Sequence, residues 1–193
     1  MNKYSESRFG AALLAAAISV LINCLPARAS AIDGLMSRAY QEMSSGHNEE
    51  AVRTMSVAVR TEPNNAMARR YLANALLRSG MAADALVQFR ALIELKQATA
   101  KDKSAIGDAN FYLSKYDDAI AWYQTALKED PTLDSARVGL THTYVAMKQH
   151  QKACQIIADA VRQPRTEESR REYYALFTNI KEQMQPTREH LDE

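Results

Sequence analysis

The chain has 193 residues, with 24 Lys and Arg against 23 Asp and Glu and a formal net charge of +1. This near-neutral balance lacks the strong positive field that nucleic-acid-binding proteins use, so nucleic acid is excluded as the expected partner. Only six glycines and five prolines interrupt a sequence rich in Ala, Leu and Met. That composition favours helices over a sheet.

Residues 1–29 are predicted to be a signal peptide. Lys3 and Arg8 form a basic start, residues 11–25 form an apolar run, and Ala27-Arg28-Ala29 follows a proline with small residues at the two positions that signal peptidase reads. We therefore expect cleavage after Ala29 and a periplasmic or secreted mature chain that does not insert into a membrane. The alternative is an uncleaved helix anchored in the inner membrane, because the apolar run is only slightly shorter than a bilayer span.

A 34-residue repeat fills most of the remaining sequence. Its positions hold small or bulky apolar residues in phase over four units. The columns are Ala51, Ala85, Ala119 and Ala153; Met55, Phe89, Tyr123 and Ile157; Ala58, Leu92, Ala126 and Ala160; and Ala39, Ala73, Gly107 and Thr141.

Each unit is predicted to be a pair of antiparallel helices, because apolar residues recur at helical spacing. Gly46 and Gly80 are placed to end a first helix in the left-handed conformation. Prolines punctuate two unit boundaries, where Asn64 or Asn65 and, at the other boundary, Thr132 are expected to cap the incoming helix. The boundary without proline offers Thr99 and Asp102 as a cap instead.

The third unit carries a family resemblance in Ile106-Gly107, residues 116–120, Tyr123, Ala126-Leu127 and Asp130-Pro131. These residues closely resemble the tetratricopeptide repeat, and the other units match it more loosely. The resemblance implies an all-α, right-handed superhelical solenoid over residues 30–165, with four units at about 32–65, 66–99, 100–133 and 134–165. The first unit departs from the family at Arg38 and Glu42, which an outer face in water would tolerate.

A further helix is expected over residues 166–185. Thr166 precedes acidic residues, and Tyr173, Phe177, Ile180 and Met184 form one apolar stripe. Such a helix would cap the last repeat; the alternative is a stripe that binds a partner or a second copy of the chain. Residues 186–193 are predicted to be a flexible tail.

The sequence contains no recognisable catalytic, cofactor or metal-binding motif. The four histidines are scattered, without the spacing of metal ligands, and phosphate-binding loops and nucleophile elbows are missing. After signal cleavage one cysteine remains, Cys154, so no internal disulfide can form. We therefore expect no enzyme activity, no cofactor and no metal.

The resemblance also implies where partners bind, since the first helix of each tetratricopeptide unit lines a groove. The matching positions are Tyr40, Met43, Arg70, Asn74, Leu77, Lys101, Asp108, Phe111, His142 and Val145. Arg70 and Asn74 match two groups of the clamp that some members use for a peptide carboxylate, but Ala105, Ser135 and Gly139 stand where further groups are needed.

These features predict a scaffold or adaptor of the cell envelope that binds a peptide or helix of another protein. Assembly of an envelope, pilus or secretion complex is the expected setting, and self-association is compatible with the methionine-rich first unit. The alternative is a regulatory accessory subunit of a periplasmic or cell-wall enzyme.

Overall fold

A computed structural model describes residues 31–162 and 166–184. The predicted signal peptide and the predicted tail at residues 186–193 lie outside these ranges. Every regular element within them is a helix, which confirms the predicted all-α repeat fold; its superhelical hand remains a prediction. The helices are residues 31–44, α2 (Asn48–Thr61), α3 (Ala66–Arg78), α4 (Ala82–Glu94), α5 (Ala100–Tyr112), α6 (Tyr116–Glu129), α7 (Asp134–Ala146), α8 (His150–Arg162) and α9 (Glu167–Met184).

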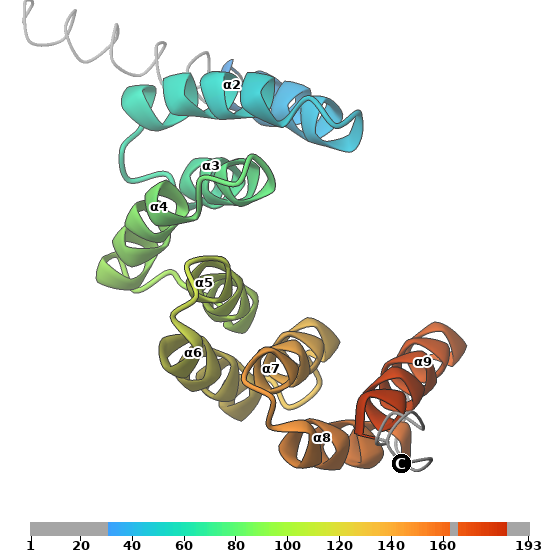
Figure 1. The fold of residues 1–193 in the computed structure, drawn as a ribbon. Coiled ribbons are helices and arrows are strands. Elements are labelled where there is room, and N and C mark those ends of the chain that lie inside the picture. Colours follow the sequence, from blue (N-terminus) through green and yellow to red (C-terminus); the bar gives the residue numbers. More distant parts are fainter. Residues whose placement is uncertain (1–30, 163–165, 185–193) are drawn as a thin grey trace, which may run out of the picture. The chain divides into compact units, whose positions relative to one another are not determined.

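The chain divides into two compact units, Met1–Ala75 and Leu76–Glu193. In the described part of the first unit, residues 31–44 and α2 are joined by a short turn. In the second unit each helix from α4 to α9 contacts the next one along the chain, and α5 also contacts α7 (Figure 1). No helix within the described ranges combines the length and the apolar character that crossing a membrane requires.

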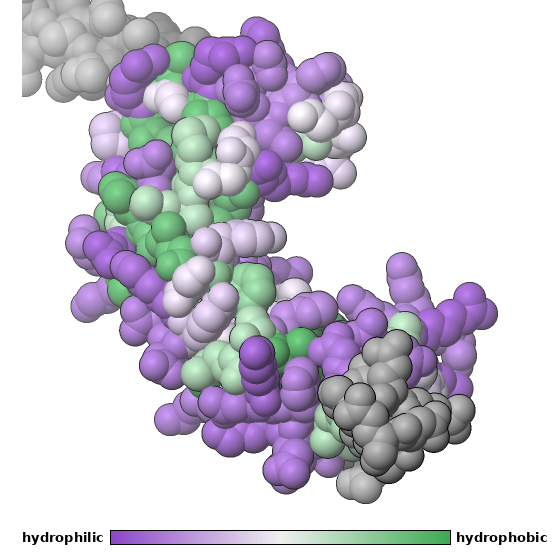
Figure 2. Space-filling view, viewed as in Figure 1, coloured by the Kyte–Doolittle hydropathy of each residue, from purple (hydrophilic) through white to green (hydrophobic). Residues whose placement is uncertain are grey.

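The predicted columns form the buried positions of these helices. Every member is buried, and most have no exposed surface: Ala39, Ala51, Met55 and Ala58 in the first unit, and Ala85, Phe89, Leu92, Ala119, Ala126, Ala153 and Ile157 in the second. Small residues in these columns let helices approach closely. Figure 2 shows hydrophobic surface over α4, where Val87 is exposed. The surface over α8 is mostly hydrophilic, and Ala153, Ile157 and Ala160 of this helix are buried.

The turn inside each helix pair has one geometry throughout. Gly46 and Gly80 adopt the predicted left-handed conformation, with φ of 81° and 76°, and Ser114 and Lys148 adopt it at the equivalent positions with φ of 58° and 59°. At each turn this residue donates its N–H three residues back and the next residue donates five residues back, as Ser114 and Lys115 do to Phe111 and Asn110. This Schellman pattern satisfies carbonyls that the helix end leaves without partners.

The connections between pairs differ in how they start the next helix. The backbone N–H of Ala68 donates to Asn65 Oδ1 over 3.0 Å, and Thr99 and Asp102 form a reciprocal capping box at α5, both as predicted. The prediction for Thr132 is wrong, because its N–H and hydroxyl both bond to Asp130 and α7 begins without a side-chain cap.

Two prolines are held by arginines at equivalent positions of the repeat. Arg69 donates to the carbonyl of Pro63 over 2.6 Å, and Arg137 donates to that of Pro131 over 2.7 Å. Both bonds tie the bend between units to the first turn of the following helix.

Of the two residues that depart from the repeat pattern, Arg38 lies on the surface and Glu42 is half-buried, with its side chain 13% exposed. The Arg38 side chain is 69% exposed and pairs with Glu42 over 2.8 Å, and Glu42 also accepts the Thr54 hydroxyl. The substitution therefore leaves the buried columns of this unit untouched.

α9 covers α8 with the predicted apolar stripe. Tyr173 and Ile180 are buried, Phe177 is half-buried, and Tyr173 joins a cluster with Ile157 and Ala160 of α8. Met184 is 44% exposed. The Thr166 hydroxyl accepts the N–H of Ser169, which is the cap that the sequence predicted.

Candidate functional site

The buried ring of Tyr123 organises the centre of the second unit. It crosses between two helical glycines: a Cβ added at Gly107 would lie 2.6 Å from Tyr123 Cε1, and one added at Gly139 would lie 2.5 Å from it. Real Cβ atoms do not approach a ring this closely, so both positions must stay without a side chain while the ring is there. The ring therefore fixes α6 against α5 on one side and α7 on the other.

The hydroxyl of Tyr123 forms a hydrogen bond with a carboxylate. It donates to Asp108 Oδ1 over 2.6 Å. Burial raises the pKa of Asp108, although the hydrogen bond from Tyr123 acts in the opposite direction. Burial and the neighbouring Asp108 carboxylate raise the pKa of Tyr123, so the phenol remains a donor at physiological pH.

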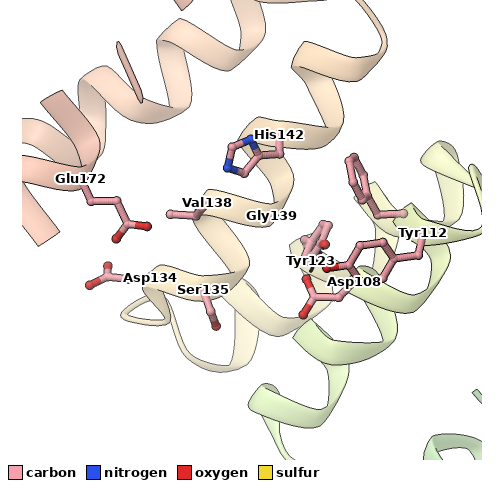
Figure 3. Close-up of a pocket in the computed structure, with 10 residues that line it drawn as sticks. Asp108, Tyr112, Tyr123, Asp134, Ser135, Val138, Gly139, His142 and Glu172 are labelled. Atoms are coloured by element: carbon pink, nitrogen blue, oxygen red, sulfur yellow. Dashed lines mark hydrogen bonds between the residues drawn. The ribbon is translucent and has the colours of Figure 1, made fainter. Parts of the chain in front are cut away.

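A pocket of about 500 Å³ opens beside this pair. Asp108, Phe111 and Tyr112 come from α5 and Tyr123 from α6, while Glu172 comes from α9; α7 contributes Asp134, Ser135, Val138, Gly139 and His142. Figure 3 shows Glu172 and Asp134 on one side and Asp108 and Tyr112 on the other, with Ser135, Val138, Gly139 and His142 of α7 between them. The pocket is therefore built from four helices of one compact unit.

The aromatic wall of the pocket is only partly buried. Phe111 is half-buried and its ring lies 6.0 Å from that of Tyr112 in an edge-to-face arrangement, and 5.8 Å from that of Tyr116. The Tyr112 side chain is 67% exposed. Such rings offer a flat apolar surface to an incoming group.

Asp134 has its charge and hydrogen bonds satisfied inside the protein. It pairs with Arg137 over 3.0 Å and accepts hydroxyls from Ser169 and Tyr173. Burial and the bond to Asp134 raise the pKa of Tyr173 to about 12. This cluster ties α7 to α9 and thereby positions the wall that carries Glu172.

Three of the ten predicted groove residues meet in this pocket: Asp108, Phe111 and His142. Leu77 and Val145 are half-buried and Lys101 is exposed, and none of these three lines the pocket. Asp108 and Phe111 lie on α5 and His142 lies on α7, and both are first helices of a pair, as the resemblance implied.

The remaining four predicted residues lie in the first unit. Tyr40 is 63% exposed and Asn74 is exposed, while Arg70 is half-buried with Nη1 3.0 Å from Met67 Sδ. Met43 is only 7% exposed, so its placement on a groove is wrong: this side chain belongs to the core, where a flexible methionine fills space.

The other residues that line the pocket were not predicted as groove residues: Tyr112, Tyr123, Asp134, Ser135, Val138, Gly139 and Glu172. Gly139 was noted only as a poor match to a carboxylate clamp, and the structure supplies its reason in the Tyr123 ring. A glycine inside a helix costs stability through its low helix propensity, so Gly107 and Gly139 were the sequence signal that could have pointed to this crossing. Within the described ranges, no group of three His, Cys, Asp or Glu side chains is arranged to hold a metal ion.

Comparison with known proteins addresses the fold. Residues 112–178 match the model of the tetratricopeptide repeat, and residues 10–99 match that of the bacterial transcriptional activator domain. No curated protein matches the sequence.

Solved structures similar to the chain share little sequence with it. MamA from Desulfovibrio magneticus RS-1 (residue 41 to the end) has a TM-score of 0.64 at 20% identity, covering 70% of this chain and 77% of its own. PilF of Pseudomonas aeruginosa has a TM-score of 0.63 at 18% identity, covering 79% and 77%.

A third similar structure is the first TPR of Spaghetti (RPAP3) bound to an HSP90 peptide, with a TM-score of 0.57 at 22% identity, covering 62% of this chain and 94% of its own. Together with the match over residues 112–178, these likenesses support the tetratricopeptide-repeat resemblance and show that the described helices have the fold of such proteins.

Proposed function

We propose that this protein is a non-catalytic scaffold that binds a segment of another protein in the pocket between α5, α6, α7 and α9. The observation that carries the proposal is the pocket itself, a cavity of about 500 Å³ with an exposed aromatic rim. Peptide sites of this kind combine apolar anchoring surfaces with a few placed polar groups. The peptide-bound RPAP3 domain, of similar fold, is consistent with this use of the fold.

We place this activity in the cell envelope. The support is the pattern of residues 1–29, with a basic start, an apolar run and small residues before Ser30. Assembly of an envelope, pilus or secretion complex is the setting proposed. An N-terminus at Ser30, measured by sequencing the protein from fractionated cells, would support export; a protein that keeps residues 1–29 in the cytoplasm would contradict it.

The binding proposal is tested by cross-linking in cells. A photo-reactive amino acid at Tyr112 lies on the rim of the pocket, and one at Val87 on α4 gives a matched control, because both side chains are more than half exposed (67% and 58%). We expect a discrete cross-linked partner from position 112 and none from 87. The same partner must be lost when Ser135→Trp fills the pocket from α7. Capture that survives Ser135→Trp, or that is equal at both positions, contradicts the proposed site.

A further inference from the structure

The charges that line the pocket are of one sign. Asp108, Asp134 and Glu172 come from α5, α7 and α9. None of the described residues that line the pocket is a lysine or an arginine. A partner group that enters it therefore meets carboxylates from more than one side.

The charge of one of these carboxylates, Asp134, is compensated within the protein. Asp134 is compensated by Arg137 and by two hydroxyl donors. Asp108 and Glu172 stand on opposite sides of the pocket (Figure 3), and the electrostatic attraction for a cation between them is not offset by a lining cation. The unbalanced charge therefore lies across the cavity, between α5 and α9.

Asp108 is held in place before any partner arrives. Its Oδ1 accepts the Tyr123 hydroxyl over 2.6 Å, and the Tyr123 ring is confined between Gly107 and Gly139. Burial deprives this carboxylate of water, which raises its pKa. A cation that pairs with it would offset that lost solvation, and it would find the acceptor already oriented.

The aromatic side of the pocket adds a second requirement. Phe111 and Tyr112 present rings beside Asp108, and a planar cation can stack on a ring while donating to a carboxylate. Arginine has this planarity and several donors, whereas the ammonium of lysine is a compact point charge. The lining thus fits a guanidinium better than an ammonium.

We propose that the pocket binds an arginine side chain of the partner segment, with its guanidinium between Asp108 and Glu172 and against the rings of Phe111 and Tyr112. This rests on the proposed function and specifies what the site recognises. Its charge preference is opposite to that of a clamp for a peptide carboxylate, and Ser135 and Gly139 agree with it because they add no positive charge to α7.

The test uses a peptide pair that differs only in charge. The ¹⁵N-labelled full chain is titrated with N-acetyl-Gly-Arg-Gly-amide and with the same peptide carrying citrulline, the neutral isostere of arginine. We expect amide shifts concentrated at Asp108, Tyr112 and His142 with the arginine peptide. We expect the citrulline peptide to bind at least about tenfold more weakly, the loss of a charge-assisted hydrogen bond.

Asp108→Asn and Asp84→Asn provide the matched variants. Asparagine at 108 keeps an acceptor for the Tyr123 hydroxyl, and Asp84 is an exposed carboxylate of α4 outside the pocket lining. Asp108→Asn should weaken arginine-peptide binding by about tenfold or more, and Asp84→Asn by less than twofold, consistent with a screened surface charge.

Three outcomes overturn the inference: no pocket shifts at millimolar arginine peptide, citrulline binding within twofold of arginine, or equal binding by the two variants. These outcomes are separate from failure of the proposed function. If Tyr112 still captures a partner that Ser135→Trp abolishes, the protein binds a segment there that is not anchored by arginine.

Discussion

The α5–α6 and α7–α8 pairs have the same repeat spacing and the same turn, but they fill the crossing between their helices differently. In α5–α6 a glycine, Gly107, meets the ring of Tyr123; at the equivalent positions of α7–α8 stand Thr141 and Ile157, both fully buried. The α5–α6 crossing thus combines a large side chain with a glycine, whereas the α7–α8 crossing combines two side chains of intermediate size. The repeat therefore constrains the combined volume of the two side chains at the crossing more than the identity of either one.

Of these two crossings, only the one with Tyr123 places a polar crossing side chain at the pocket. The Tyr123 hydroxyl reaches Asp108, whereas Ile157 packs with Ala160 and Tyr173 in an apolar cluster. The crossing in α5–α6 therefore contributes a polar group to the pocket, whereas the crossing residue Ile157 of α8 packs against the terminal helix. Three predictions test this contrast.

Exchanging the crossing residues should give the largest effect. Gly107→Thr places a side chain against the Tyr123 ring, where a Cβ would lie 2.6 Å from Cε1, and overpacking should lower the free energy of unfolding by about 3 kcal/mol. Adding Tyr123→Ile recreates the α7–α8 combination, so the two changes should couple favourably by about 1 kcal/mol or more. Urea denaturation measures both. Effects that simply add would show that volume is not shared at this crossing.

The turns should respond alike in the two pairs. Ser114 and Lys148 hold a left-handed conformation that is costly for residues with a Cβ, so Ser114→Gly and Lys148→Gly should each raise the free energy of unfolding by about 1 kcal/mol. Gly80→Ala, the reverse change at an equivalent turn with φ of 76°, should lower it by a similar amount. Thermal unfolding gives the comparison. A loss of stability in either glycine variant would mean that its side chain contributes more than the strain costs.

The smallest expected effect is a change in how stability depends on pH. Burial raises the pKa of Asp108 in the folded state, so the folded protein holds this proton more tightly than the unfolded chain does. Its contribution to stability is present below a pH of about 4 and is lost as the pH rises through the folded-state pKa.

Asp108→Asn cannot ionise, so its melting temperature should exceed that of the wild type at pH 7, and the gap should close as the pH falls towards 4. The difference between the two proteins isolates the contribution of Asp108 from that of the other ionisable groups. A gap that widens at low pH would mean that the ionised carboxylate is favoured by the fold, contrary to the direction inferred here.

The sequence contained most of the fold because each repeated position repeats one physical requirement. Four alanines at 34-residue spacing, beginning with Ala51, are buried at helix crossings, and two glycines mark the first two left-handed turns. The last two turns could not be predicted from residue type, since Ser114 and Lys148 have no intrinsic preference for that conformation. Tertiary packing imposes it on them.

The site was predictable only in part. The resemblance named Asp108, Phe111 and His142, which line the candidate pocket. It also named Met43, which is buried, because a helix face can be assigned from spacing while burial depends on neighbours. Glu172 could not be assigned to the pocket from sequence, since it lies 64 positions after Asp108 and arrives there only because α9 folds onto α8.

The contact between α9 and α8 links the pocket to local unfolding of α9. Helices at the end of a repeat array open locally more readily than those inside it, and α9 carries Glu172, one wall of the pocket. A ligand that bridges Asp108 and Glu172 binds only while α9 is docked, so occupancy must slow hydrogen exchange in α9 as well as around Asp108. The helix that covers the end of the array is thus also the part of the molecule whose local unfolding reports whether the pocket is filled.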